Sequence, residues 1–120
     1  MATITYTVTV ATGTNQYGTG NKFYINGSVS PDLNLIEGNT YIFDQSDSTN
    51  GTHFLRFSTS ANNDPAAPYT TGVTVTGTPG TDGKTTIVVA ANAPTLYYYC
   101  TAHAGMGGAA YTLAAGSIST

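Results

Sequence analysis

Apolar and polar side chains alternate along much of this chain in short runs that suit β-strands. The clearest run covers residues 4–10, where Ile, Tyr and Val alternate with Thr. A period of two in β-branched and aromatic residues is typical of a strand with one buried face. Similar runs predict strands over residues 22–25, 28–30, 33–36, 40–44, 53–58, 73–76, 85–90, 95–100 and 109–113. No segment keeps a period of 3.6, so we expect almost no helix.

Turn-forming residues separate these runs. Asn26-Gly27 favours the positive φ angles of a two-residue hairpin. The polar stretches 11–21, 44–51 and 61–68 are expected to be loops. Short strands at this spacing predict an all-β fold, a Greek-key β-sandwich or barrel of seven to nine strands. No internal repeat or domain boundary is visible, so we expect residues 1–120 to form a single domain.

The chain carries few charges. Only 8% of its 120 residues are charged, against about 25% in an average soluble domain, and the net charge is −3. Three basic residues cannot neutralise many phosphates, which excludes nucleic-acid binding. A single cysteine excludes an internal disulfide. No apolar run approaches the roughly 20 residues that span a bilayer, and residues 1–8 lack the features of a secretory leader, so we expect no membrane insertion and no signal peptide.

The residues suited to chemistry gather in the last third of the chain. Cys100, His103 and Met106 share one expected loop, and the other histidine, His53, lies at the start of an expected strand. Two imidazoles, a thiolate and a distant thioether are the donor set of a type 1 copper site. The only methionine outside this set is Met1. We therefore expect these four residues to be able to bind one copper ion, although a functional need for that ion does not follow.

The same residues leave other interpretations open. Cysteine is among the most buried residue types and methionine fills gaps, so both could simply pack. Zinc is an alternative ion, but a thioether is a poor zinc ligand. Cys100 and His103 could form a nucleophile and base, yet the sequence shows no recognisable orienting group or oxyanion donors, so we expect no enzyme. Asp44, Asp47 and Asn50 lack the spacing of a calcium loop and are expected to be solvated.

With these residues placed, the chain resembles the cupredoxins, the blue-copper proteins. The spacing Cys100-x₂-His103-x₂-Met106 matches the short ligand loop of amicyanin-like members, in which a Ser or Thr, here Thr101, often follows the cysteine. The resemblance implies a cupredoxin fold in which His53 supplies the fourth copper ligand.

The sequence departs from that family at one position. In many electron-transfer members an Asn directly follows the first histidine and ties the two ligand loops together, whereas here that position is Phe54. Side chains of this kind orient metal ligands. Asn50, from the preceding loop, is a candidate for the same role.

Two longer stretches resemble more specifically the cupredoxin-like domains of marine phage and bacterial surface proteins, over roughly residues 20–110. They are Leu35-Ile-Glu-Gly-Asn-Thr-Tyr-Ile-Phe-Asp-Gln-Ser-Asp and Leu96-Tyr-Tyr-Tyr-Cys-Thr-Ala-His-Ala-Gly-Met-Gly-Gly. This resemblance implies a structural protein of a virion or other extracellular assembly, such as a capsid decoration, whose partners are copies of itself or other virion or surface proteins. The alternative is a soluble type 1 copper electron-transfer protein. The sparse charge and the absence of a leader favour the structural role.

Small residues surround His103 on its expected loop. They are Ala104, Gly105, Met106, Gly107, Gly108, Ala109 and Ala110. Such residues would leave a flat, weakly polar patch at one pole of the domain. In electron-transfer cupredoxins a patch of this kind docks redox partners, and it could equally be a contact between subunits.

Overall fold

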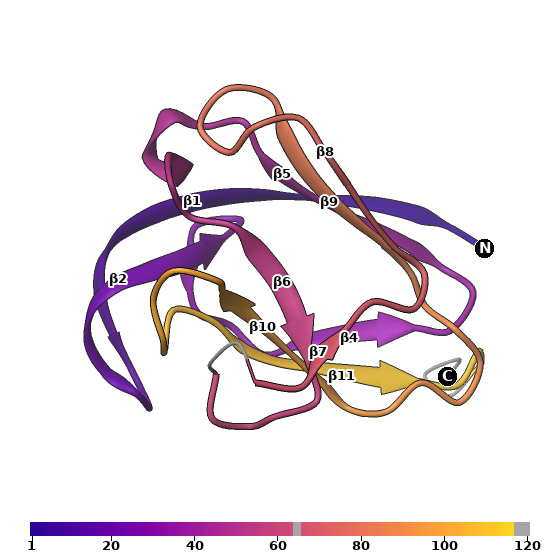
Figure 1. The fold of residues 1–120 in the computed structure, drawn as a ribbon. Helices are drawn as coiled ribbons and strands as arrows, with labels where there is room; N and C mark the ends of the chain where they lie inside the picture. Colours follow the sequence, from indigo (N-terminus) through magenta and orange to yellow (C-terminus); the bar gives the residue numbers. More distant parts are fainter. Residues whose placement is uncertain (64–65, 117–120) are drawn as a thin grey trace.

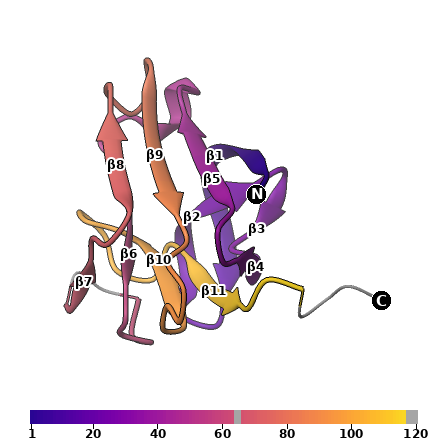
Figure 2. The same cartoon turned by 90° about the vertical axis from the view of Figure 1, so that its right-hand side faces the viewer.

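The computed structural model describes residues 1–63 and 66–116, and it shows two β-sheets packed face to face (Figures 1 and 2). In spatial order, the first sheet contains β3 (Ser28–Val29), β2 (Gly18–Ile25), β1 (Thr3–Asn15), β5 (Thr40–Gln45), β9 (Gly83–Val88) and β8 (Val73–Thr76). The second contains β4 (Leu33–Ile36), β11 (Gly108–Leu113), β10 (Leu96–Cys100), β6 (Leu55–Ser58) and β7 (Pro68–Tyr69). This arrangement confirms the predicted all-β sandwich.

Several connections between strands, such as those from β3 to β4, from β4 to β5 and from β5 to β6, cross from one sheet to the other, as in Greek-key folds. Most paired strands are antiparallel, but β1 pairs with β5, and β4 with β11, in parallel. The predicted hairpin at Asn26-Gly27 is confirmed, because it joins β2 to β3 and both residues have positive φ angles, 49° and 86°.

The core fills the space between the sheets. Val8 and Val10, on one face of the alternating run in β1, are buried as the pattern predicts. Phe43 of the first sheet packs edge-on against Phe57 of the second, with 5.4 Å between ring centroids. The other buried members are Phe23, Ile25, Leu33, Leu35, Tyr41, Leu55, Ile87, Val89, Leu96, Tyr98, Cys100, Met106 and Ala110. Two of the predicted copper ligands therefore form part of the apolar core.

The prediction of a loop over residues 11–21 is wrong. β1 continues to Asn15 and β2 begins at Gly18, so these residues form a long hairpin. Thr14 and Thr19 are cross-strand partners, and their hydroxyl groups lie 2.8 Å apart. Backbone bonds and threonine pairs hold this ladder without apolar side chains, which is why hydrophobic alternation missed it.

The strand count also exceeds the prediction. The described residues contain eleven strands, against the seven to nine predicted, and β7, with only two residues, leaves no hydrophobic pattern. The predicted loop over residues 44–51 includes the end of β5 and one short 3-10 helix, η1 (Ser48–Asn50), which Asp47 caps. No helix in the described part of the chain is long and apolar enough to cross a membrane.

Pairing in the second sheet brings two distant segments of the chain together. β6 and β10 are antiparallel neighbours, and Cys100 lies opposite Leu55. Thr101 continues the pairing, since its backbone N–H donates to the Phe54 carbonyl oxygen over 3.1 Å. The residue that precedes β6 and the loop that follows β10 therefore meet at one pole of the sandwich, at the left of Figure 1.

Candidate metal centre

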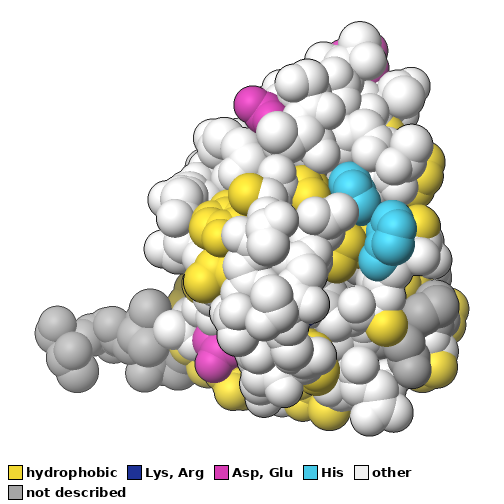
Figure 3. Space-filling view, turned by 90° about the vertical axis from the view of Figure 1, so that its left-hand side faces the viewer, with side chains coloured by type: hydrophobic (Ala, Val, Ile, Leu, Met, Phe, Trp, Pro, Cys, Tyr) yellow, Lys and Arg dark blue, Asp and Glu magenta, His cyan; other side chains and the backbone are white. Residues whose placement is uncertain are grey.

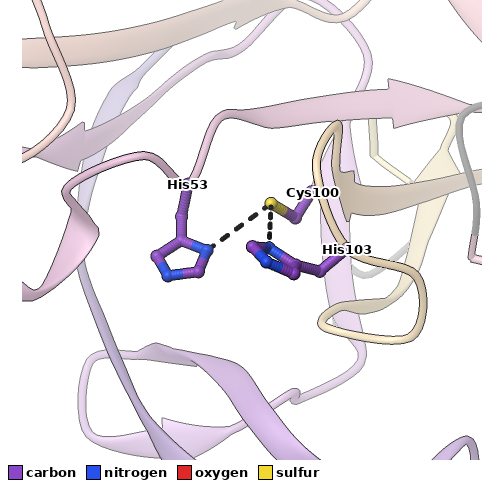
Figure 4. Close-up of side chains that lie close together, drawn as sticks. All are labelled: His53, Cys100 and His103. Carbon is purple, nitrogen blue, oxygen red and sulfur yellow. Dashed lines mark hydrogen bonds between the residues drawn. The ribbon is translucent and has the colours of Figure 1, made fainter.

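Three of the four predicted copper ligands converge at this pole. The sulfur of Cys100 lies 3.7 Å from Nδ1 of His53 and 3.8 Å from Nδ1 of His103 (Figure 4). Their ligand atoms all lie within 4.8 Å of one another. In the described residues this is the one group of three or more His, Cys, Asp or Glu side chains close enough to share a metal ion.

These distances fit a single metal ion bound between the three side chains. Bonds of about 2.1 Å to nitrogen and about 2.3 Å to sulfur would separate the two atoms by about 3.8 Å at the angle of a trigonal plane, and by about 3.6 Å at a tetrahedral angle. The observed separations of 3.7 and 3.8 Å lie at or near the trigonal value. Two imidazoles and a thiolate in a plane suit copper. The cluster is therefore consistent with one type 1 copper ion.

The three side chains differ in their exposure to solvent. Cys100 is fully buried and His53 is 7% exposed, whereas His103 is exposed. Burial, with a smaller contribution from the charge of His103, lowers the pKa of His53. A lowered pKa keeps the imidazole neutral, which is the form that binds metal. The site thus has a dry interior and one imidazole at its surface.

The fourth predicted ligand, Met106, lies on the same loop and is 1% exposed. Its side chain belongs to the hydrophobic core. Its backbone carbonyl oxygen accepts bonds from the Phe23 N–H, over 2.9 Å, and from the Ser30 hydroxyl, over 3.0 Å. The backbone of Met106 is therefore fixed by bonds to β2 and to the residue after β3, and its role as an axial ligand stays a prediction.

Buried amide side chains hold the backbone of His53. Gln45, 1% exposed at the end of β5, donates from Nε2 to the His53 carbonyl oxygen over 2.8 Å and accepts the Leu55 N–H at Oε1. The Asn50 carbonyl oxygen accepts the His53 N–H over 2.8 Å. Because both the N–H and the carbonyl oxygen of His53 are hydrogen-bonded, the backbone is fixed and the ring is oriented toward Cys100.

Asn50 does not tie the two ligand loops together, contrary to the role considered for it. Its side-chain amide donates to the carbonyl oxygens of Val8 and Asp47 and accepts from Gln45, so it anchors the His53 loop to β1 instead. The direct link between the two ligand segments is the backbone bond from Thr101 to Phe54. A backbone group replaces the expected side chain because the two strands are already adjacent.

Asn63 anchors the ligand loop, although no sequence pattern indicates this role. It is fully buried in the loop between β6 and β7 and has a φ of 55°, a conformation that Asn tolerates better than most residues. Its side chain donates to the Tyr98 carbonyl oxygen over 2.8 Å and accepts the Gly107 N–H over 2.9 Å. Its carbonyl oxygen accepts the Gly105 N–H over 2.9 Å. Asn63 thus joins the ligand loop to β10 through three bonds.

The carbonyl oxygen of Gly105 is a second anchor point of the loop. The ammonium group of Lys22 and the amide of Asn15 both donate to it, each over 2.8 Å. Lys22 is 4% exposed, and burial lowers its pKa. The backbone of Gly107 lies close to the backbone of Tyr98. A Cβ at position 107 would lie only 1.8 Å from the Tyr98 carbonyl oxygen. These contacts hold the loop in place between Cys100 and β11.

The surface at this pole is poor in charge. Figure 3 shows the two histidines side by side, with hydrophobic side chains next to them and no Lys or Arg in view. Residues 101–104 of the ligand loop are exposed, and Ala102 and Ala104 flank His103. The weakly polar patch expected around His103 is confirmed only in part, because residues 101–104 form it whereas the small residues from Gly105 to Ala110 are buried.

Comparison with protein-family models and with curated protein sequences found no match. Solved structures do match. A blue copper oxidase from Nitrosomonas europaea shares 15% identity at a TM-score of 0.55, over 95% of this chain and 39% of that one. A laccase from Pediococcus acidilactici shares 17% identity at a TM-score of 0.56, over 96% of this chain and 27% of that one. Fet3p, a multicopper oxidase that functions in iron import, shares 17% identity at a TM-score of 0.53, over 94% of this chain and 23% of that one.

The fold is cupredoxin-like. At identities of 15–17% the similarity carries the fold alone, and the chain spans only 23–39% of the matched structures. The resemblance to cupredoxins is thus confirmed for the architecture. Within this cupredoxin-like domain, the position of His53 before β6 and of Cys100 at the end of β10 follows from the pairing of those strands.

The two acidic residues considered for a calcium loop, Asp44 and Asp47, accept hydrogen bonds from residues two positions further along the chain. Asp44 accepts the Ser46 N–H over 2.9 Å, and Asp47 accepts the N–H and hydroxyl of Thr49. These bonds lower the pKa of both carboxyl groups. The expectation that this stretch is solvated is confirmed for Asp47, which is exposed, but Asp44 is half-buried in β5, and the expectation is wrong for Asn50, which is fully buried.

Proposed function

We propose that this domain is a type 1 copper electron-transfer protein, in which His53, Cys100 and His103 would hold the ion and Met106 would supply a weaker fourth ligand. The observation that carries the proposal is the placement of two Nδ1 atoms at 3.7 and 3.8 Å from one buried sulfur. Copper bound by such donors supplies one-electron chemistry, because soft sulfur ligands accept both oxidation states.

The protein supports this chemistry by fixing its ligands and by leaving one of them exposed. Gln45 and Asn50 hold the His53 backbone, and Asn63 holds the ligand loop. Ligands fixed by bonds to the protein change position little when the charge of the ion changes, which favours fast electron transfer. The exposed imidazole of His103, whose Nδ1 lies 3.8 Å from the buried sulfur, connects the site to a partner at the surface.

The partner that suits this pole is another redox protein with a weakly charged docking face. The patch around His103 has exposed alanines and lacks visible basic residues. Contacts without complementary charges depend little on ionic strength. We therefore expect the rate of electron exchange with such a partner, and between copies of this domain, to change little with salt.

A single copper ion passes one electron at a time. The matched structures named as oxidases and a laccase are much longer than this chain. The described residues contain one cluster of three or more potential ligands, so electron transfer rather than oxidase activity is the role proposed here.

The structural role in a virion or extracellular assembly stays a prediction, as do the expected partners and location. No contact or surface in the described residues bears on it. A measurement of mass in solution addresses it, since interfaces of an assembly bury more than roughly 1,000 Å² and would hold copies together.

Copper loading tests the electron-transfer proposal. Metal-free protein given one equivalent of Cu(II) should bind it in a 1:1 ratio and turn blue through thiolate-to-copper charge transfer, and voltammetry should give a reversible one-electron wave. Cys100→Ser should keep the fold, as judged by circular dichroism, but lose the colour. A colourless wild-type product, or one without stoichiometric copper, would overturn the proposal.

A further inference from the structure

A pocket lies on the side of β10 opposite the copper cluster. It has a volume of about 330 Å³ and opens between β6, β7 and β8. Figure 2 shows β8 and β7 along the same edge of the sandwich, next to β6. Its main lining residues are Arg56, Tyr69, Val73, Val75, Tyr99 and Thr101. The volume lies at the lower end of the range for sites that bind small organic molecules.

The pocket contains one cation without an acidic partner. Nη1 of Arg56 donates to the Leu55 carbonyl oxygen over 2.8 Å and lies 3.3 Å from the Thr85 hydroxyl. No carboxylate among the described residues contacts the guanidinium. Nε and Nη2 carry three further N–H donors with no partner in the described chain, and none of these atoms is buried without one. These donors are therefore open to solvent or to a ligand.

The position of the guanidinium is fixed although it lacks an ion pair. Its two internal bonds tie it to β6 and β9, and it lies 5.9 Å from the centroid of the Phe54 ring. A planar guanidinium held in one orientation is prepared for two parallel bonds to a carboxylate, which are strong and directional. The residue is thus arranged for an anion that none of the described residues provides.

The walls of the pocket are apolar and aromatic. Tyr99 is 3% exposed and lies opposite Arg56 in the strand register, so both share one face of the sheet. Tyr69 of β7 and Val73 and Val75 of β8 form the remaining sides. Surfaces of this kind exclude a strongly hydrated inorganic anion but suit a flat apolar ring.

We propose that this pocket binds a small aromatic carboxylate, whose carboxylate group pairs with Arg56 and whose ring lies between the tyrosine and valine side chains. The site is separate from the copper cluster. Because side chains alternate along a strand, Tyr99 points away from the Cys100 sulfur, and the bound ring sits one residue from a predicted ligand on the other face of β10.

Benzoate is the probe, with benzamide as a neutral molecule of the same shape. Titration of metal-free, isotope-labelled protein followed by NMR should show benzoate shifting the amide signals of Tyr69, Tyr99 and Thr101. Benzamide should bind at least about tenfold more weakly, since it cannot form charge-assisted bonds to the guanidinium. Equal binding of the two molecules, shifts confined to other residues, or no binding of benzoate would overturn the proposal.

Two pairs of variants locate the site. Arg56→Gln should weaken benzoate binding at least about tenfold, whereas Lys84→Gln, at an exposed cation outside the pocket, should not. Val75→Asp should abolish binding by placing a carboxylate beside the guanidinium. Val88→Asp is the matched control for Val75→Asp. Val88 is 48% exposed, against 44% for Val75, and does not line the pocket. Similar losses in Val75→Asp and Val88→Asp would contradict the assignment even if Arg56→Gln failed to fold.

The same titration repeated on copper-loaded protein separates this inference from the proposed function. Benzoate binding to the metal-free domain requires no metal, so it would persist if copper failed to bind. Conversely, if the protein turns blue with copper but does not bind benzoate, the electron-transfer proposal stands and the proposed carboxylate site is wrong.

Discussion

The sulfur of Cys100 lies 3.7 Å from Nδ1 of His53, although 47 positions separate the two residues along the chain. The antiparallel pairing of β6 with β10 creates this contact, because it sets Leu55 opposite Cys100 and places the preceding histidine beside the following loop. The site therefore depends on the folded sheet, and its two histidines differ in how much of that sheet covers them. This difference leads to the first prediction.

Removal of each imidazole should have different consequences. In His103→Gly the lost ring leaves an opening at the surface, so added imidazole should enter and restore the blue absorption of the Cu(II) protein. In His53→Gly the gap lies at a residue that is 7% exposed, and imidazole should restore little colour. Absorption spectra with and without imidazole test this. Equal rescue of both variants would contradict the assigned burial of the two ligands.

Met106 should tune the copper ion rather than hold it. Met106→Leu conserves volume in the core and should cost less than about 1.5 kcal/mol of unfolding free energy. Loss of the thioether weakens Cu(II) more than Cu(I), so the reduction potential should rise by about 59 mV for each tenfold change in their relative affinities. Voltammetry measures the shift, with Met1→Leu, at a fully exposed methionine, as the control. An unchanged potential would show that Met106 is not an axial ligand.

Asn63 should matter for both stability and the site. Asn63→Ala removes two buried side-chain bonds, leaves the Gly107 N–H without its acceptor and places alanine at a positive φ angle. We expect a loss of about 2–4 kcal/mol in unfolding free energy and weaker copper binding. The neighbouring exposed Asn62 provides the control, and Asn62→Ala should change stability by less than about 0.5 kcal/mol in denaturant titrations. Similar effects of the two substitutions would argue against the anchoring role.

Lys22 should make stability depend on alkaline pH. Burial lowers the pKa of its ammonium group below the ordinary value of 10.5, so the folded state holds this proton less tightly than the unfolded chain does. Between the two pKa values the unfolded chain binds more protons, and the unfolding free energy rises with pH. Lys22→Met, which carries no charge, should be more stable than wild type at pH 7.

That advantage should shrink as the pH approaches and passes 10.5, because wild-type Lys22 then becomes neutral in both states. Denaturant titrations at several pH values give the difference, in which the ionisation of the tyrosines cancels. Lys84→Met, at an exposed lysine, should show no such trend. A constant difference between Lys22→Met and wild type across this pH range would contradict the burial cost.

Most strands and the ligand loop could be predicted because both show a local pattern in the sequence. The alternation of residues 4–10 identified β1, and the short spacing from Cys100 to Met106 indicated a ligand loop. The approach of His53 to Cys100 was predicted from the copper donor set and from the resemblance to cupredoxins. The hairpin through Thr14 and Thr19 was missed because polar cross-strand pairs do not alternate in hydrophobicity.

The supporting contacts could not be predicted, because they join residues that no local pattern relates. Gln45 reaches the His53 backbone from the neighbouring sheet, and Asn63 reaches the ligand loop from the connection after β6. Both amides look like ordinary polar residues in the sequence, and only their burial reveals their role. The Arg56 guanidinium, which contacts no carboxylate among the described residues, is equally invisible, since its surroundings are a property of the folded chain.

The close approach of Gly107 to Tyr98 limits how this domain can be re-engineered. A side chain at position 107 would collide with the Tyr98 carbonyl oxygen, which belongs to the backbone and cannot swing aside. Any foreign loop grafted between Cys100 and β11 must therefore bring a glycine to its last position, whatever its length or metal preference. Random mutagenesis of the segment should return glycine there, and histidine at position 103, in every blue clone, with variation at the exposed positions 101, 102 and 104.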